Sequence, residues 1–487
     1  MKKSILTLCL VLLSNLIYSQ VYTILDTQKN QVFGYLVFEL AEKTSKREYI
    51  YSLSLMNVDL QRINQTTFSD SDAIKIGNIH YNGNSIYFEV VPEKTDISKI
   101  ETRDFSYRIY NLDANTVSPK AELSEKHKKI YVIGSYPIQN KGFGLVINNS
   151  KTNVNQLYAI TDNNELLYNT YPYGNPDKKK QTEEIVIGDI QGDLLVTVNK
   201  IAPRSKSKKV TTSLLFLNSV TGDTIKEATL DTEKYKIDLS KAKIVGDEVL
   251  AFGDAYAKKK SIKSGKTEGL VKTSLDFQGN IKSQKEVVWE DLKPIVKIKK
   301  GGKKKGKGLM YTHDFVVDTN SKHVIVVGEY LKGSRSRIKV KDMYFMDFDN
   351  DFNLTQVYEV KTKTATIYLN DIKAKGAKQY GEVVKEYNYF NYKFHNQLNQ
   401  ENGISFYYFH SEKISNNMAQ GVVNYNNGTF TNVPLTWQKA EWKNQKLNLL
   451  PSKPGYILTS KLSDNKIQTN LHPIEVSTVV ETEENNN

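Results

Sequence analysis

The chain has 487 residues, of which 39% are apolar and 10% aromatic, so it can form a sizeable core and wholesale disorder is excluded. Its 67 lysines and arginines against 54 acidic residues give a net charge of +13, which favours anionic partners. Cys9 is the only cysteine, so an intramolecular disulfide and a cysteine-ligated metal site are both excluded.

Residues 1–19 have the pattern of a secretory signal peptide. Lys2 and Lys3 form a positive start, Ile5–Leu13 is apolar, and a cleavage site is expected before Gln20. The apolar run is shorter than the about 20 residues that a membrane span needs. The sequence therefore predicts an exported protein that is periplasmic, outer-membrane-associated or extracellular, with no transmembrane segment in the mature chain. Because Cys9 lies within residues 1–19, the mature chain would contain no cysteine, which suits a bacterial envelope.

Short apolar runs recur along the rest of the chain, at intervals of about 40 to 80 residues. They are rich in β-branched and aromatic residues and are bounded by turn residues, which indicates strands. Their apolarity is continuous rather than alternating, as in strands that are covered on both faces. The runs are Gly34–Phe38, Ser85–Phe88, Lys129–Tyr136, Asp193–Val198, Glu248–Gly253, His323–Tyr330, Ile404–Tyr408 and Gly455–Leu458.

Each run is followed by a polar loop, a strand, a tight turn rich in Gly and Asn, and another strand. Several runs also have a strand before them. Four antiparallel strands per unit predict an all-β fold, a single β-propeller of seven or eight four-stranded blades over residues 20–476. Tandem β-sandwiches are the alternative. The expected units are 21–70, 71–125, 126–175, 183–232, 238–290, 309–362, 385–437 and a thin last unit at 440–476.

Three further segments stand out from the strand pattern. Lys299–Gly308 is rich in Lys and Gly, so it is predicted to be a flexible loop. Residues 477–487 form an acidic, Asn-rich tail that is predicted to be disordered. Residues 371–386 could hold a short helix, although Gly376 and Gly381 weaken that pattern.

The basic residues are clustered in the sequence. Every cluster falls either between the second and third strands of a unit or between two units. In a four-stranded antiparallel blade both kinds of connection emerge at the same end of the ring, so that end is predicted to be basic. The alternative is that these lysines only keep the protein soluble. The candidate binding residues are Arg204, Lys258, Lys259, Lys260, Lys303, Lys304, Lys305, Arg335 and Arg337.

Motifs of the common hydrolases, metalloproteases and nucleotide-binding proteins are absent from the sequence. His313 and Asp314 are adjacent on a strand expected to border the central channel, and Asp189 has a similar position in its own unit. A histidine beside a carboxylate can act as a general base. These three residues are the catalytic candidates, with a structural hydrogen-bonding pair as the alternative.

The sequence predicts no cofactor. Calcium is the alternative, because one segment resembles a calcium loop. Asp347, Asp349 and Asp351 place carboxylates at alternate positions, as calcium loops do. The segment lacks the glycine and the later glutamate of an EF-hand loop, and it lies where a hairpin turn is expected.

The chain resembles a family of uncharacterised exported proteins of Bacteroidota-type bacteria. The resemblance is carried by Tyr18–Gln20, Thr312–Asp318, Val326–Tyr330 and Lys341–Phe345. Because the family has no assigned activity, the resemblance implies export and a propeller-like fold but no site.

We therefore expect a non-enzymatic binding or scaffold protein of the bacterial envelope. Its partner would be an anionic polysaccharide, lipopolysaccharide or an envelope protein, held by the lysine-rich end of the propeller. A polysaccharide lyase or hydrolase acting at the channel mouth is the alternative. Nucleic acid is an unexpected partner for an exported protein.

Overall fold

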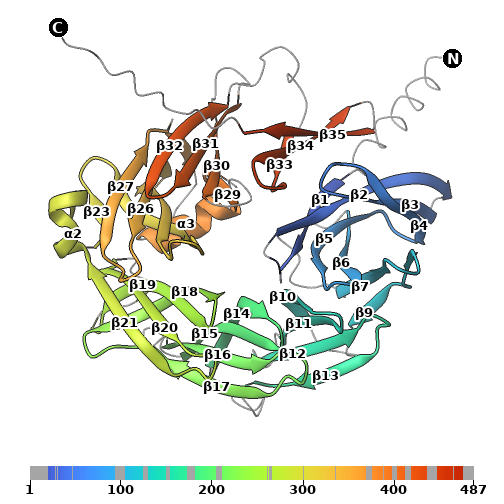
Figure 1. Cartoon of the computed structure of the whole chain (residues 1–487), viewed down its shortest axis with the longest axis horizontal. Coiled ribbons are helices and arrows are strands. Elements are labelled where there is room, and N and C mark those ends of the chain that lie inside the picture. The colour runs from blue at the N-terminus through green and yellow to red at the C-terminus, as the bar shows by residue number, and fades with distance from the viewer. Residues whose placement is uncertain are drawn as a thin grey trace, which may run out of the picture.

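A computed structural model describes residues 20–474 apart from 28, 30, 46–47, 94–104, 124–129, 150–153, 173–180, 204–210, 260–261, 263–265, 300, 335, 363, 369–375, 388, 398–402, 412–417, 436–446 and 464–465. Within these residues the strands form eight antiparallel sheets around a ring (Figure 1). Seven sheets have four or more strands and are the blades of a β-propeller. The eighth has three strands and lies between the last blade and the first. The predicted propeller is confirmed.

In the four-stranded blades the strands follow the chain from the centre of the ring outward (Figure 1). Blade one consists of β1 (Gln20–Asp26), β2 (Gln31–Ser45), β3 (Glu48–Met56) and β4 (Arg62–Asp70), and blade two of β5 (Ile74–Tyr81), β6 (Ser85–Pro92), β7 (Phe105–Asn111), β8 (Thr116–Val117) and β9 (Ala121–Leu123). Blade three consists of β10 (Ile130–Ile138), β11 (Gly142–Asn149), β12 (Val154–Thr161) and β13 (Leu166–Thr170). Blade four consists of β14 (Gln181–Gln191), β15 (Leu194–Pro203), β16 (Thr211–Asn218) and β17 (Thr224–Thr229).

The remaining sheets and the two described helices follow in the second half of the chain. Blade five consists of β18 (Tyr235–Val245), β19 (Glu248–Ala257), β20 (Gly269–Leu275) and β21 (Ile281–Val288), and α2 (Trp289–Val296) follows it. Blade six consists of β22 (Ile298–Lys299), β23 (Lys303–Lys304), β24 (Gly308–Val317), β25 (Val324–Gly333), β26 (Arg337–Phe348), β27 (Leu354–Val360) and β28 (Ala365–Tyr368), and α3 (Ala377–Glu386) follows it. Blade seven consists of β29 (Tyr392–Gln397), β30 (Ile404–Ser411), β31 (Met418–Asn426) and β32 (Thr429–Leu435), and the eighth sheet of β33 (Leu447–Leu450), β34 (Tyr456–Ser463) and β35 (Lys466–Pro473).

The apolar core lies between neighbouring sheets and explains why the apolar runs are continuous. In β25, Val324 and Val326 pack into the cluster shared with blade five. The alternate residues Ile325 and Val327 pack into the cluster shared with blade seven. Both faces of this part of the strand are therefore covered, which explains why the four successive residues Val324–Val327 are all apolar. Because every sheet packs against two neighbours, the sandwich alternative is wrong.

The three-stranded sheet closes the ring between blade seven and blade one. Leu458 of β34 packs in the cluster that contains Tyr35 of blade one. Its neighbour Ile457 packs against Tyr407 of blade seven. The hydroxyl of Tyr35 also lies 2.8 Å from Oγ of Ser452, and both groups are buried. Without this sheet the apolar faces of two blades would meet water.

One local prediction differs from the structure, and one helix was not predicted. The predicted flexible loop at Lys299–Gly308 instead contains β22 and β23, which pair with each other and extend blade six from β24. Glycines at positive φ, including Gly301 and Gly306, allow these tight reversals despite the low-complexity sequence. Helix α3 begins at Ala377, within the segment predicted to hold a helix, whereas α2 is not expected from the sequence.

Residues 1–19 and 477–487, the predicted signal peptide and tail, lie outside the described residues. In the part of the chain that is described, neither helix has the length and apolar character needed to cross a membrane.

Candidate functional site

The innermost strands of blades four, five and six carry a charged residue at the same position. Each of these strands contains a β-bulge. The first residue that is paired after the bulge is Asp189 in blade four, Lys241 in blade five and Asp314 in blade six. A bulge adds one residue to one strand and redirects the side chains beside it. The three residues are therefore equivalent in their blades and lie on the strands that border the central channel (Figure 1).

Asp314 is bonded to two neighbouring blades. Nζ of Lys241 in blade five donates to Oδ1 of Asp314. Nδ1 of His395 in blade seven lies 3.4 Å from Oδ2, and the hydroxyl of Tyr392 lies 3.0 Å from the same ring nitrogen. Burial opposes ionisation, but the hydrogen bond from His395 and the charge of Lys241 outweigh it and hold the pKa of Asp314 well below its usual range. Asp314 is thus ionised at neutral pH.

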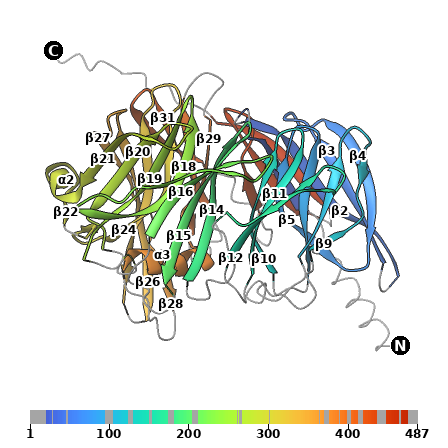
Figure 2. The same cartoon turned by 90° about the horizontal axis from the view of Figure 1, so that it is seen from below.

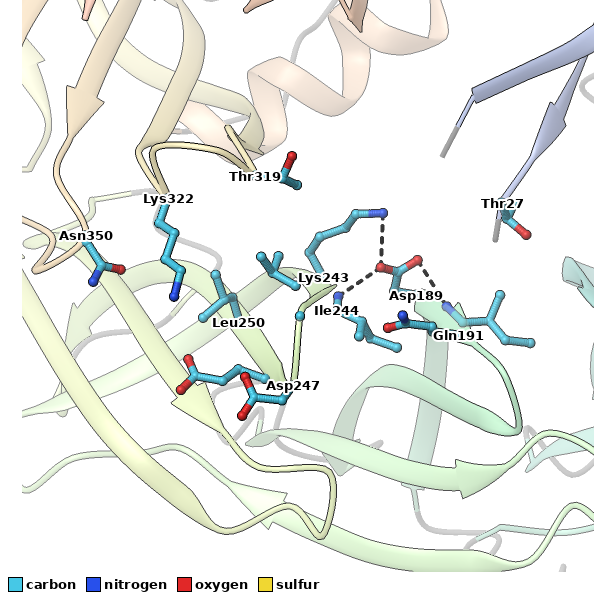
Figure 3. A pocket seen from close by; sticks show the side chains of 14 residues that line it. Thr27, Asp189, Gln191, Lys243, Ile244, Asp247, Leu250, Thr319, Lys322 and Asn350 are labelled. Atoms are coloured by element: carbon cyan, nitrogen blue, oxygen red, sulfur yellow. Dashed lines mark hydrogen bonds and ion pairs between the residues drawn. The ribbon is translucent and has the colours of Figure 1, made fainter. Parts of the chain in front are cut away.

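Asp189 has its own set of partners (Figure 3). Its Oδ2 lies 3.0 Å from Nζ of Lys243 and accepts a hydrogen bond of 2.9 Å from the backbone N–H of Ile244. Together with Thr27 and Lys322 the pair lines a pocket of about 280 Å³, at the end of the ring where the hairpin turns lie. Both oxygens of Asp189 are bonded, because Oδ1 accepts from the N–H of Ile190 at 3.0 Å.

His313 does not contact the carboxylate of the adjacent Asp314. Its Nε2 lies 3.1 Å from Oε1 of the fully buried Glu329. The same glutamate accepts hydrogen bonds from Nδ2 of Asn391 at 2.8 Å and from the backbone N–H of Tyr392 at 2.9 Å. His313 and Asp314 therefore have different charged partners, since successive residues on a strand point to opposite faces. Tyr392 connects their two sets of contacts, because its N–H bonds Glu329 and its hydroxyl lies near His395.

The candidate calcium ligands also point to different partners. Asp347 is buried, with Oδ1 2.8 Å from Nδ1 of His323 and Oδ2 accepting from the hydroxyl of Tyr425 at 3.1 Å. Oδ1 of Asp349 accepts from the N–H of Asn353 at 2.7 Å and closes its own turn, and Asp351 is exposed. Across the described ranges, no three His, Cys, Asp or Glu side chains are grouped to hold a metal ion.

Blade five contains a pair of acidic residues that the sequence analysis did not select. Asp238 on β18 is paired directly opposite Asp254 on β19. Nζ of Lys200 lies 2.9 Å and Nζ of Lys378 lies 2.6 Å from the carboxylate of Asp238. Burial, followed by the nearby charge of Asp238, raises the pKa of Asp254 to about 7. The two lysines come from blade four and from α3, so only the folded chain brings this group together.

The most distinctive surface feature is a groove between blade six and α3, with a volume of about 880 Å³. It lies among the connections that carry the predicted basic clusters: β19 to β20, blade five to β24, and β25 to β26. Figure 2 places α3 and β28 toward the same end of the ring. We call it the lysine groove. Its described lining residues are Lys266, Lys299, Lys303, Lys304, Lys305, Lys332, Gly301, Gly306, Gly308, Gly333, Leu309, Leu331 and Tyr380.

One wall of the lysine groove is the β22–β23 hairpin, which is anchored to the outer strand of the blade. Glu359 accepts from Nζ of Lys304 and, at 2.6 Å, from Nζ of Lys307. It also accepts from the hydroxyl of Tyr330 at 2.8 Å. These contacts fix the hairpin, while Lys303 and Lys305 have no acidic partner within ion-pair distance among the described residues.

The other predicted binding residues lie beside these connections or outside the described residues. Lys258 and Lys259 are exposed just after β19, and Arg337 is exposed at the start of β26. Lys260, Arg204 and Arg335 lie outside the described residues. The groove also contains Tyr380, which the sequence analysis did not select because nothing in the repeat pattern marks α3.

A family of unknown function (DUF6770) matches residues 21–336 and 330–475 of the chain. The chain belongs to this family. The two matches extend from blade one to the eighth sheet, so the DUF6770 match covers the whole ring. The predicted membership of a family without an assigned activity is confirmed. No curated protein matches this DUF6770 chain.

Solved structures with a similar fold include the Dos1 propeller, with a TM-score of 0.42 and 8% identity over 94% of this chain and 93% of that one. Dipeptidyl peptidase 4 of Porphyromonas gingivalis is similar at a TM-score of 0.45 and 10% identity, over 91% of this chain and 56% of the peptidase. Puromycin hydrolase is similar at 0.43 and 8%, over 82% of this chain and 53% of the hydrolase. The likeness concerns the propeller fold of this DUF6770 chain alone.

Proposed function

We propose that this protein binds an anionic ligand of the bacterial envelope through the lysine groove and acts as a binding or scaffold protein. The observation that carries the proposal is the composition of the groove. Six lysines line it, and none of the other described lining residues is acidic. The ligand class comprises anionic polysaccharide, lipopolysaccharide or an acidic surface of an envelope protein.

The electrostatics of the groove support this proposal. Like charges that share one groove repel each other, and an anion relieves that repulsion. The positive potential also attracts anions before contact and accelerates their encounter. By contrast, the carboxylates of Asp189 and Asp314 are already paired with lysines, which gives the enzymatic alternative no free acid or base at those residues.

Charge reversal tests the proposal. The double variant Lys303→Glu with Lys305→Glu is compared with Lys29→Glu with Lys141→Glu, an equal change of charge at the hairpin-turn end of the ring. Binding of polygalacturonate and lipopolysaccharide is measured at low and high salt. We expect the groove variant to lose more than about tenfold in affinity at low salt, and the control to lose much less. Equal losses from both variants would rule out a dedicated groove.

We further propose that residues 1–19 are removed on export to the bacterial envelope. The first residue after the proposed cleavage site, Gln20, is also the first residue of β1 and pairs with Phe38 on β2. The chain that remains would therefore keep every described blade. N-terminal sequencing of the protein from fractionated cells tests this. A cytoplasmic protein that still carries Met1–Ser19 would disprove it.

A further inference from the structure

The floor of the lysine groove is apolar although its rim is charged. Leu309 on β24 and Leu331 on β25 are directly paired in the sheet and both line the groove. Beside them Gly308 and Gly333 contribute no side chain. The ring of Tyr380 lies against Gly333, where an added Cβ would come within 2.0 Å of its Cζ atom. Leu331 is fully buried, so the accessible lining combines ammonium groups with surface of Leu309 and Tyr380, which are half-buried.

Among the described residues that line the groove, few side chains can accept a hydrogen bond from a sugar hydroxyl. Its described lining consists of Lys, Gly, Leu and Tyr alone. Neither a carboxylate nor a carboxamide is among these residues, so side-chain acceptors for sugar hydroxyls are missing apart from the hydroxyl of Tyr380. A hydrophilic glycan would leave its hydroxyl groups facing leucine, and desolvated polar groups without partners weaken binding.

We propose that the ligand of the lysine groove is an amphiphilic anion, namely a lipid that bears phosphate groups. This inference rests on the proposed binding of anions and names their class. The phosphates contact the ammonium groups of Lys303, Lys305 and Lys332 at the rim. The apolar part adjoining the headgroup lies on Leu309 and Tyr380. Lysines next to an anionic lipid surface strengthen binding by about fivefold each, and buried apolar area adds a contribution that salt does not screen.

The hairpin anchoring supports this arrangement. Because Glu359 pairs with Lys304 and Lys307, and Asp342 also pairs with Lys307, the hairpin keeps its shape without using Lys303 and Lys305. These two lysines remain available at the rim among the described residues. The site is therefore formed before the ligand arrives, which reduces the entropy lost on binding.

The test compares two phosphate-bearing probes that differ in their apolar part. One is a vesicle of phosphatidylcholine containing phosphatidic acid, and the other is inorganic polyphosphate. The protein without residues 1–19 is titrated with each at low and high salt. We expect polyphosphate binding to disappear at high salt and vesicle binding to persist in part. Vesicles of phosphatidylcholine alone should not bind.

Two variants separate the contributions of rim and floor. Lys303→Glu with Lys305→Glu should weaken binding of both probes. Leu309→Ser should weaken vesicle binding by about tenfold and leave polyphosphate binding within about twofold, because it removes apolar floor and no charge. If Leu309→Ser does not fold, the salt series on the unaltered protein decides.

The outcomes distinguish the inference from the proposed function. If polyphosphate and vesicles show the same salt dependence and Leu309→Ser has no effect, the amphiphile assignment is wrong and anion binding stands. If neither probe binds, both proposals fail. Binding to phosphatidylcholine alone would show that phosphate is not recognised and would overturn the assignment.

Discussion

Oδ2 of Asp314 lies 3.4 Å from Nδ1 of His395, a residue of the next blade. Because Asp314 also pairs with Lys241 of the preceding blade, one carboxylate connects three blades at the channel wall. Charged side chains on inner strands thus serve as contacts between blades in this propeller, in addition to the apolar clusters that hold the sheets together.

Replacing Asp314 by Asn should destabilise the protein by about 1–3 kcal/mol at pH 7, since Lys241 loses its counter-charge in a partly buried position. The pKa of Asp314 is lower in the folded than in the unfolded chain. Its stabilisation is therefore complete above the usual carboxyl pKa of about 4 and declines as the pH falls below it. Urea unfolding at pH 7 and pH 3 checks this. A cost that is equal at both pH values would contradict it.

Replacing Asp254 by Asn should make stability less sensitive to a rise in pH from about 5 to about 7. Burial and the charge of Asp238 raise the pKa of Asp254 to about 7. A group with a raised folded pKa stabilises fully below its unfolded pKa, and this contribution is lost as the pH rises through 7. Between pH 5 and 9 the unaltered protein should lose about 2–3 kcal/mol more than the variant.

The matched control for Asp254 is Asp247→Asn, because the side chain of Asp247 is 92% exposed. Unfolding of both variants by urea over the same pH range supplies the comparison. If the control changes the pH profile as much as Asp254→Asn does, Asp254 does not titrate in the proposed way.

Replacing Gly328 by Ala should cost about 2 kcal/mol or more. An added Cβ would lie 2.4 Å from the backbone oxygen of Tyr311 and 2.2 Å from Cζ of Tyr344, so the sheet must shift. Gly134→Ala is the control, because its Cβ would meet only the flexible end of Ile187, with Cδ1 at 3.0 Å. Thermal unfolding of the two variants should differ clearly, and similar melting temperatures would show that Gly328 is not constrained.

Replacing Glu359 by Gln should release the hairpin that forms one wall of the lysine groove. The change removes the charge that Lys304 and Lys307 share. Because trypsin cleaves after lysine and needs a locally open chain, cleavage within residues 303–307 should accelerate by about tenfold, which corresponds to about 1.4 kcal/mol. Glu290→Gln is the control, since Glu290 pairs with Lys293 at an exposed position. Unchanged cleavage in the Glu359 variant would show that the hairpin is held by other contacts.

The repeat could be predicted from the sequence because strand pattern and turn residues are local signals. The sheet of blade five runs from Tyr235 to Val288, and the bounds of the expected unit, 238–290, differ from these by no more than three residues. The expected unit 126–175 contains the four strands of blade three, from Ile130 to Thr170. Its apolar run lies on the first strand, β10, which begins at Ile130, whereas the second strand is β11, Gly142–Asn149. Both strands are apolar, so composition alone did not separate them.

The site was less accessible to prediction. The lysine-rich segment that contributes Lys303 and Lys305 was singled out as a binding candidate and was predicted to be a flexible loop, because its repeated charges resemble those of a disordered linker. Glu359, which orders it, follows Lys304 by 55 residues. A comparison of the inner strands could have found Lys241, since it occupies the same position after a bulge as Asp189 and Asp314.

The sequence by itself determined the propeller fold and the repetition of its units along the chain. These follow from short apolar runs, turn chemistry and chain connectivity, which act over a few residues or one blade. The tertiary structure alone decided which charges pair. Lys241 meets Asp314 across 73 residues and Lys378 meets Asp238 across 140, because such partners lie on different blades and meet only when the ring is closed. It also decided that the lysine groove has an apolar floor, since Leu309, Leu331 and Tyr380 come from separate elements that only packing brings together.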